Sequence, residues 1–282
     1  MRLGIRAILL GLCLLQLGVL SGCAMSGLPQ FNKLDRLRVI AITTDQSEVA
    51  PGSSVVVTPY VSDTRGAGRA LTYTAESCSD TGVAFGATPT CTGAADRVSV
   101  GTGSLSLTAP TYTQAVSSFT VTVPSTILTS RSVIDQYNGV AYLFVYTVTA
   151  ADGTEVRSFR RILATTRTTR NSIPSITSFL FDDAAGTIPT TGEAQISAVL
   201  PTGAAEAYQA MAVDTTLKDL TETLTVSWFL SDGDFQRFRT VGSAANKFTA
   251  PSPRPSDRPV VVAAVVRDGR GGEAVRIESV GP

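Results

Sequence analysis

Short segments in which apolar and polar residues alternate one by one make up most of the chain after residue 37. Residues 71–75 read Leu-Thr-Tyr-Thr-Ala, and residues 118–123 read Ser-Phe-Thr-Val-Thr-Val. A period of two places the apolar side chains of a strand on one face. Turns rich in Gly, Pro, Asp and Thr separate these segments. The chain is therefore predicted to be all-β, with antiparallel sheets that have one buried and one solvated face.

One pair of segments is predicted to form a hairpin near the middle of the chain. Residues 140–149 are almost continuously apolar, which favours a central strand. The sequence Ala-Asp-Gly at residues 151–153 is a strong turn signal, and residues 156–164 then form the partner strand.

The second half of the chain repeats the pattern of the first. Residues 224–228 parallel residues 71–75, and Thr-Ala-Pro at residues 249–251 repeats residues 108–110. The strands expected at residues 260–266 and 273–279 flank the turn Asp268-Gly269, as in the earlier hairpin. These repeats predict two copies of one β-sandwich. Each copy has an insert that can hold a short helix, at residues 125–139 and 201–223.

The repeat sets the expected domain boundaries. The first sandwich is predicted at residues 34–164 and the second at residues 175–282. Residues 165–174 between them are polar, lack apolar periodicity and end at Pro174, which holds its neighbour extended. A linker this short predicts sandwiches placed end to end with restricted bending.

The repeated unit resembles the immunoglobulin-like and PKD-like modules of bacterial surface proteins. The resemblance depends on the strand around Trp228 and on the closing sequence Val-Val-Arg-Asp-Gly-Arg-Gly-Gly at residues 265–272. It implies that Trp228 packs between the two sheets, as the corresponding tryptophan does in immunoglobulin domains. The chain lacks the inter-sheet cysteine pair of those domains.

The N-terminus has the form of an export signal. Arg2 and Arg6 precede an apolar run at residues 7–20, which is too short for a membrane-spanning helix of about 20 residues. Leu-Ser-Gly-Cys at residues 20–23 resembles the lipobox of bacterial lipoproteins. An uncleaved membrane anchor and an ordinary secretory signal are the alternatives.

The resemblance to the lipobox implies that residues 1–22 are a signal peptide, cleaved between Gly22 and Cys23. Cys23 then carries covalent lipid, and residues 23–33 form the lipidated tether to the membrane. Two or more acyl chains give durable anchoring. Ala24 favours sorting to the outer membrane, and the side that the protein faces, periplasm or surface, stays open.

Two cysteines remain once the signal and the lipid are accounted for. Cys13 lies in the signal and Cys23 receives lipid, which leaves Cys78 and Cys91. In an oxidising compartment this pair is predicted to form a disulfide that staples a local loop.

The composition excludes several classes of function. The chain has 23 Lys and Arg against 23 Asp and Glu, so nothing favours nucleic acid as a partner. It has no histidine, which removes Ser-His-Asp and Cys-His catalysis and His-based zinc sites. The carboxylates Asp182, Asp183, Asp232 and Asp234 lie in turn-like sequence, where Asp bonds to its own backbone. We therefore expect no enzyme activity.

Three further groups of side chains are candidates for binding. Asp232, Asp234 and Asp268 are weak candidates for calcium, which prefers oxygen ligands; no other metal or cofactor is expected. Three tyrosines fit either of two interpretations, a sugar or peptide platform or core residues: Tyr137, Tyr142 and Tyr146. Three arginines are expected on a solvated strand and its end, Arg157, Arg160 and Arg161.

These observations predict a non-catalytic, lipid-anchored envelope protein that binds a protein or polysaccharide partner. The alternative is an accessory subunit that packs against a larger secretion, adhesion or motility machine.

Overall fold

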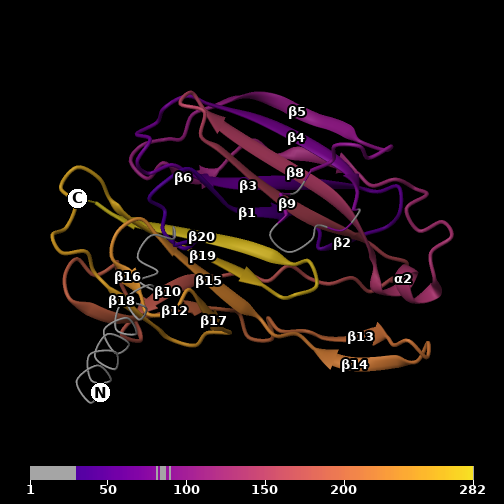
Figure 1. Cartoon of the computed structure of the whole chain (residues 1–282). Coiled ribbons are helices and arrows are strands. Elements are labelled where there is room, and N and C mark those ends of the chain that lie inside the picture. The colour runs from indigo at the N-terminus through magenta and orange to yellow at the C-terminus, as the bar shows by residue number, and fades with distance from the viewer. Residues whose placement is uncertain (1–29, 81, 83–86, 89, 282) are drawn as a thin grey trace, which may run out of the picture. The chain divides into compact units, whose positions relative to one another are not determined.

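The computed structural model describes residues 30–80, 82, 87–88 and 90–281. The protein is almost entirely β, with 48% strand and 2% helix, as the alternating pattern predicted. From Asn32 onward the chain forms one compact unit. It contains a first lobe, residues 34–164, and a second lobe, residues 176–281 (Figure 1). The predicted signal peptide, with Gly22 and Cys23 at its predicted cleavage site, lies outside the described residues.

The first lobe consists of two sheets that face each other across a core. One sheet is formed by β1 (Arg38–Thr44), β3 (Ser54–Ser62), β6 (Thr113–Ala115) and β7 (Phe119–Thr122). The other has the order β2 (Glu48–Val49), β9 (Glu155–Ala164), β8 (Val140–Ala150), β4 (Leu71–Ser79) and β5 (Val98–Leu105). The predicted hairpin is confirmed, with β8 as a central, buried strand.

The second lobe repeats this arrangement. One sheet has the order β11 (Ala184–Ala185), β10 (Ser178–Phe181), β12 (Glu193–Val199), β18 (Asn246–Thr249) and β16 (Asp234–Phe235). The other has the order β17 (Arg239–Val241), β15 (Thr225–Leu230), β19 (Val260–Arg267) and β20 (Glu273–Val280).

Strand order gives both lobes the immunoglobulin-like arrangement. In the first lobe β1, β3 and β7 share one sheet, and β4, β8 and β9 share the other. In the second lobe β10, β12 and β18 correspond to the first set, and β15, β19 and β20 to the second. In the first lobe, β2 crosses to the second sheet and pairs in parallel with the last strand, β9. The fold class predicted from the sequence is therefore confirmed.

Each lobe has its own apolar core. The first is filled by valines of β3 and by aromatic rings from β4, β7 and β8. In the second, Trp228 is completely buried, and its ring lies 5.5 Å from Phe179 and 5.6 Å from Phe235, both on the opposite sheet. Trp228 thus packs between the sheets, as the resemblance implied.

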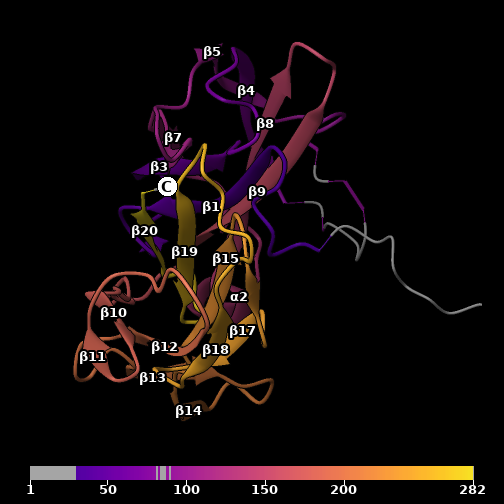
Figure 2. The same ribbon diagram turned by 90° about the vertical axis from the view of Figure 1, so that its left-hand side faces the viewer.

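A third apolar cluster joins the two lobes. Ile40 and Ala41 of β1 pack against Phe229 of β15 and against Val261, Ala263 and Val265 of β19. Figures 1 and 2 show β19 and β20 between β1 and the rest of the second lobe. This explains the unbroken apolar run of β19, because both of its faces are buried. The expected end-to-end placement is wrong, because the lobes pack side against side along β19 and Phe229 of β15.

Ion pairs at the lobe junction add to this contact. Arg160 of β9 donates to Glu273 of β20 at 2.7 Å, and their side chains are 11% and 6% exposed. Arg65 of the first lobe and Arg258 of the second both donate to Asp232 at 2.9 Å. The expectation of a solvated arginine strand is therefore wrong for Arg160, which is buried at the junction.

The two inserts have different structures. The first contains the short helix α2 (Val133–Asn138), with Ser132 as its N-cap. The second forms a two-stranded ribbon of β13 (Ala207–Met211) and β14 (Leu217–Thr221). Its alternating residues favour strand pairing, so the possible helix at residues 201–223 does not form. Within the described residues, no helix is long and apolar enough to cross a membrane.

The predicted disulfide between Cys78 and Cys91 is present. Their Cα atoms lie 5.7 Å apart, and both residues are buried. The bridge fastens the end of β4 to the loop before β5. It lies in a local loop, away from the contact between the two sheets.

Candidate functional site

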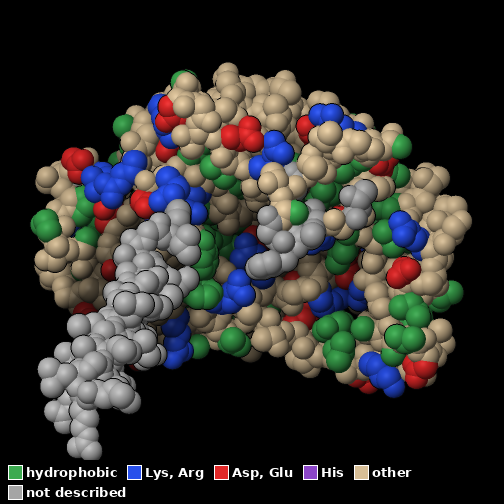
Figure 3. Space-filling view, viewed as in Figure 1, with side chains coloured by type: hydrophobic (Ala, Val, Ile, Leu, Met, Phe, Trp, Pro, Cys, Tyr) green, Lys and Arg blue, Asp and Glu red, His purple; other side chains and the backbone are tan. Residues whose placement is uncertain are grey.

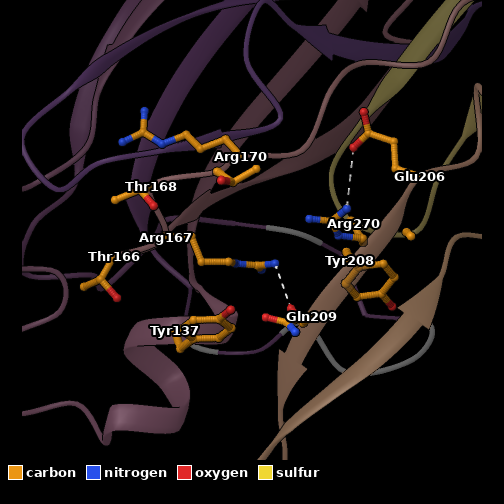
Figure 4. A pocket seen from close by; sticks show the side chains of 11 residues that line it. Tyr137, Thr166, Arg167, Thr168, Arg170, Glu206, Tyr208, Gln209 and Arg270 are labelled. Carbon is orange, nitrogen blue, oxygen red and sulfur yellow. Dashed lines mark hydrogen bonds and ion pairs between the residues drawn. The ribbon is translucent and has the colours of Figure 1, made fainter.

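A hollow of about 480 Å³ lies where the two inserts meet the linker. Its walls are α2, linker residues 166–170, β13 and the turn between β19 and β20 (Figure 4). The first three are additions to, or connections between, the two sandwiches, and the fourth is the turn of the closing hairpin that both repeats contain. The hollow therefore arises mainly from the segments that differ between the repeats.

Hydrogen bonds from Asn138 fix the two inserts to each other. The Asn138 side chain donates to the Met211 carbonyl at 2.8 Å and accepts from the Met211 N–H at 2.9 Å. Asparagine thus makes the two bonds that a neighbouring strand would make with β13. Thr166 N–H donates to the Gln136 carbonyl at 2.9 Å and ties the linker to α2.

Arg167 crosses the hollow from the linker toward β13. Its guanidinium lies 5.4 Å from the centre of the Tyr137 ring and pairs with Glu48 at 3.1 Å. It also donates to the carbonyl oxygens of Asn138 at 3.3 Å and Gln209 at 3.5 Å. Figure 4 shows Arg167 directed toward Gln209, while Thr166, Thr168 and Arg170 extend from the other side of the linker.

Arg270 forms the corresponding wall from the second lobe. Its guanidinium lies 4.1 Å above the ring of Tyr208, a distance typical of cation–π contact. It donates to Glu222 at 2.9 Å and to Asn171 at 3.2 Å, and lies 3.5 Å from Glu48. The bend after it depends on Gly271, whose φ is +104° and whose added Cβ would meet the Ser47 carbonyl at 2.7 Å.

Two buried carboxylates compensate these guanidinium groups. The side chains of Glu48 and Glu222 are 0% and 1% exposed, and those of Arg167 and Arg270 are each 10% exposed. Burial raises the pKa of the Glu222 carboxyl, and bonds from Glu206 N–H and Arg270 offset this only in part. Removing such charges from water costs free energy that their pairing only partly returns. The network therefore fixes positions more than it adds stability.

Several groups on the hollow have no partner in the described residues. Arg170 is exposed and has no ion pair there. The side chains of Thr168 and Thr169 and the hydroxyls of Tyr137 and Tyr208 likewise make no hydrogen bond within that part of the chain. These groups are available to a ligand. They offer one positive charge and several hydroxyls, and they include no large aliphatic surface.

The calcium candidates are not brought together. Asp232 pairs with Arg65 and Arg258, and Asp234 pairs with Lys33 at 2.5 Å. Asp268 accepts from the Asn171 amide at 2.7 Å and from the N–H groups of its own turn. In the described ranges, no three Asp, Glu, Cys or His side chains form a possible metal site. Calcium binding stays a prediction.

The remaining candidate residues from the sequence lie in a turn, in the core of the first lobe and on the hollow. Asp182 and Asp183 have φ of 49° and 62° and form the turn between β10 and β11, so the turn interpretation is confirmed. Tyr142 and Tyr146 are 1% and 0% exposed in the first core, which confirms the core interpretation for both. Tyr137 alone of the three lines the hollow.

Sequence reasoning missed Arg167, Arg270 and Tyr208. Arg167 lies in a stretch that was interpreted only as a polar linker, and Arg270 in a closing turn. No local pattern marks their convergence, because they come together only through the contact between lobes. The one available signal is that both inserts contain a tyrosine, Tyr137 and Tyr208.

Comparison with known proteins adds little. No protein-family model and no curated protein matches the chain. Among solved structures, Escherichia coli alpha-2-macroglobulin activated by porcine elastase aligns with a TM-score of 0.28 and 7% identity, over 88% of this chain and 22% of the macroglobulin. The D0-D1 domain of Intimin aligns with a TM-score of 0.23 and 11% identity, over 86% of this chain and 99% of that domain. We draw no functional argument from scores this low.

Proposed function

We propose that this protein is a non-catalytic, lipid-anchored component of the outer membrane. Its two rigid β-sandwich lobes bind a protein or polysaccharide partner. The lipobox-like sequence at residues 20–23 supports the anchor. The absence of histidine, and the pairing of Asp232 with Arg65 and Arg258 and of Asp234 with Lys33, support a role without catalysis.

The position where the chain joins the body carries this proposal. Leu34 is fully buried, and its N–H donates to the Leu230 carbonyl at 2.8 Å. Leu230 N–H in turn donates to the Asn32 carbonyl at 3.0 Å. The chain is therefore fixed at the C-terminal end of β15 in the second lobe before β1 begins in the first. Since Cys23 precedes Asn32 by nine residues, the tether reaches at most about 30 Å.

The hollow lies at the opposite end of the same strands. β15 runs from Thr225, next to Glu222, to Leu230, where the tether joins. β19 runs in the opposite direction and ends at Arg267, three residues before Arg270. Six strand residues span about 20 Å, so the chain joins the body at the end of β15 that lies about 20 Å from the hollow.

The test compares wild-type protein with Cys23→Ser in cells. Mass spectrometry of the mature N-terminus should find acylated Cys23 in the wild type, and the variant should leave the membrane fraction. Cys13→Ser is the matched control and should stay membrane-bound, because residue 13 lies in the predicted signal. An unacylated wild-type N-terminus would overturn the proposal. Protease treatment of intact cells then distinguishes a surface from a periplasmic position.

The exposed ribbon favours the accessory-subunit alternative. Val213, Leu217 and Leu220 of the ribbon are 92%, 46% and 43% exposed. Figure 3 shows hydrophobic side chains gathered over β13 and β14. Exposed apolar groups of this kind often mark protein contacts. Co-purification from detergent-solubilised envelope tests this alternative: a stoichiometric complex lost in Leu217→Ser/Leu220→Ser favours it, and free protein rejects it.

A further inference from the structure

We propose that the hollow between the inserts binds an acidic saccharide, a sugar chain that carries carboxylates. The inference deepens the proposed function, since it names the chemical class of the partner. It depends on charge, on the hydrogen-bonding groups that are available, and on the bracing of the walls.

The one charge on the lining that has no ion pair in the described residues favours an anion. Three arginines line the hollow with one acidic residue, Glu206, which lies 3.9 Å from Arg270. Glu48 and Glu222 compensate Arg167 and Arg270 from behind. Arg170 is left with its charge uncompensated by any described residue. A carboxylate is the natural partner of a guanidinium, since the two form charge-assisted hydrogen bonds.

The remaining free groups favour a hydroxylated ligand. Thr168 and Thr169 lie on the linker wall, and Tyr137 and Tyr208 lie on the two inserts. Each of these four side chains can both donate and accept a hydrogen bond. Sugars present hydroxyls of the same dual character. The hollow lacks the aliphatic lining that an apolar ligand or a peptide side chain would need.

The backbone of β13 makes an extended peptide a poor occupant. A peptide would bind there by adding a strand to the edge of the ribbon. Asn138 already takes the N–H and carbonyl of Met211, and Arg167 contacts the carbonyl of Gln209. Nucleic acid is disfavoured because acidic and basic residues balance over the whole chain.

The walls are held in place before any ligand arrives. Both inserts, the linker and the closing turn are joined by the bonds of Asn138, Thr166, Arg167 and Arg270. A braced site loses less conformational entropy on binding than a flexible one. This bracing gives a function to a buried charge network that stability alone does not explain.

Isothermal titration calorimetry of the full-length protein in detergent tests the proposal. The probe is a galacturonic acid trisaccharide, and the neutral galactose trisaccharide is its counterpart. We expect binding of the acidic probe only, and weaker binding as salt is raised. Arg170→Gln should weaken binding about tenfold, because it removes one charge-assisted pair. Arg131→Gln, another exposed arginine outside the hollow, should leave affinity within about twofold.

A second variant addresses the opposite wall. Tyr208→Phe keeps the ring beneath Arg270 and removes only the hydroxyl, so it should weaken binding a few-fold with unchanged circular dichroism. No heat with the acidic trisaccharide at millimolar concentration would overturn the inference. Equal binding of the neutral sugar, or equal effects of Arg170→Gln and Arg131→Gln, would do the same. None of these outcomes depends on acylation of Cys23, so failure here and failure of the anchor are distinguishable.

Discussion

Both lobes have one large aromatic ring at the same position between their sheets, but a different strand supplies it in each lobe. In the first lobe, Ala75 of β4 faces Tyr146 of β8, and in the second, Trp228 of β15 faces Ala264 of β19. The large and small residues of the pair are thus exchanged. All four are buried. The comparison teaches that the frame requires one large ring at this level of the sandwich, and either strand can supply it.

The lobes also differ in whether the polar atom of that ring has a hydrogen-bond partner. Trp228 Nε1–H donates to Thr240 Oγ1 at 3.0 Å, so its burial leaves no unpaired donor. The Tyr146 hydroxyl is buried and has no hydrogen-bond partner among the described residues. Burial raises the pKa of this hydroxyl far above its ordinary value, so it remains a neutral phenol. The second lobe therefore has the better-satisfied core.

Removal of the second lobe's ring should have the largest effect on stability. Trp228→Ala should cost about 3–5 kcal/mol, because it leaves a large cavity between the sheets. In that background, Ala264→Tyr should restore part of the loss, since it recreates the arrangement of the first lobe. Urea unfolding of the two variants measures both values. If Ala264→Tyr is equally harmful with and without Trp228→Ala, the two lobes do not share a packing rule.

Breaking the charge contact between lobes should cost somewhat less. Glu273→Gln leaves Arg160, whose side chain is 11% exposed, without its counter-charge, and we expect a loss of about 3 kcal/mol. Glu155→Gln removes an exposed partner of Arg157 and should change stability by less than about 0.5 kcal/mol. Parallel urea titrations compare the two variants. Equal losses of unfolding free energy in the two variants would show that the ion pair at the junction contributes no more than an exposed one.

The strand pattern could be predicted because it is local. Alternation in β3 and β7, the hairpin of β8 and β9, and the position of Trp228 all follow from residues close in sequence. The exchange of the large ring between strands could not be predicted from the sequence. Tyr142 and Tyr146 share one strand face, and this alternation fits a core position as well as a binding platform. The disulfide could be predicted because Cys13 lies in the predicted signal and Cys23 in the lipobox-like sequence, which leaves only one other cysteine pair.

Contacts between the lobes could not be predicted in the same way. Arg160 lies in a strand with Arg157 and Arg161, and nothing in that run distinguishes the buried arginine from its neighbours. Its burial depends on Glu273, 113 residues later. The hollow has the same origin, since Arg167 and Arg270 meet Glu48 only after the lobes pack. Sequence periodicity records which face of a strand is buried and not which distant element buries it.

Changes to the polar atoms of the two rings, or to their partners, should reveal a further difference between the two cores. Thr240→Val leaves Trp228 Nε1–H buried without an acceptor and should cost about 1–2 kcal/mol. Tyr146→Phe removes a hydroxyl that has no partner and should be neutral or slightly stabilising. Thermal or urea unfolding gives both values. A loss from Tyr146→Phe as large as that from Thr240→Val would contradict the difference between the cores.

Acid should weaken the Asp232 contact between the lobes, the smallest effect expected. Desolvation alone would raise the pKa of Asp232, but hydrogen bonds from Arg258 and Ser231 and the charges of Arg65 and Arg258 lower it on balance. A carboxyl with a lowered folded pKa stabilises above its unfolded pKa, and this stabilisation is lost as pH falls through the folded value. Asp232→Asn should therefore cost about 1 kcal/mol at pH 7, and the difference should shrink below about pH 4.

Glu222, which pairs with Arg270 behind the wall of the hollow, provides the opposite case for the same titration. Because burial raises its folded pKa, the folded state favours its protonated form, and this contribution is lost as pH rises through the folded value. Relative to wild type, Glu222→Gln should thus gain stability as pH rises, whereas Asp232→Asn should lose it. Urea midpoints measured across a pH series test the two slopes together. Slopes of the same sign would contradict the opposite directions in which the surroundings shift the pKa values of Asp232 and Glu222.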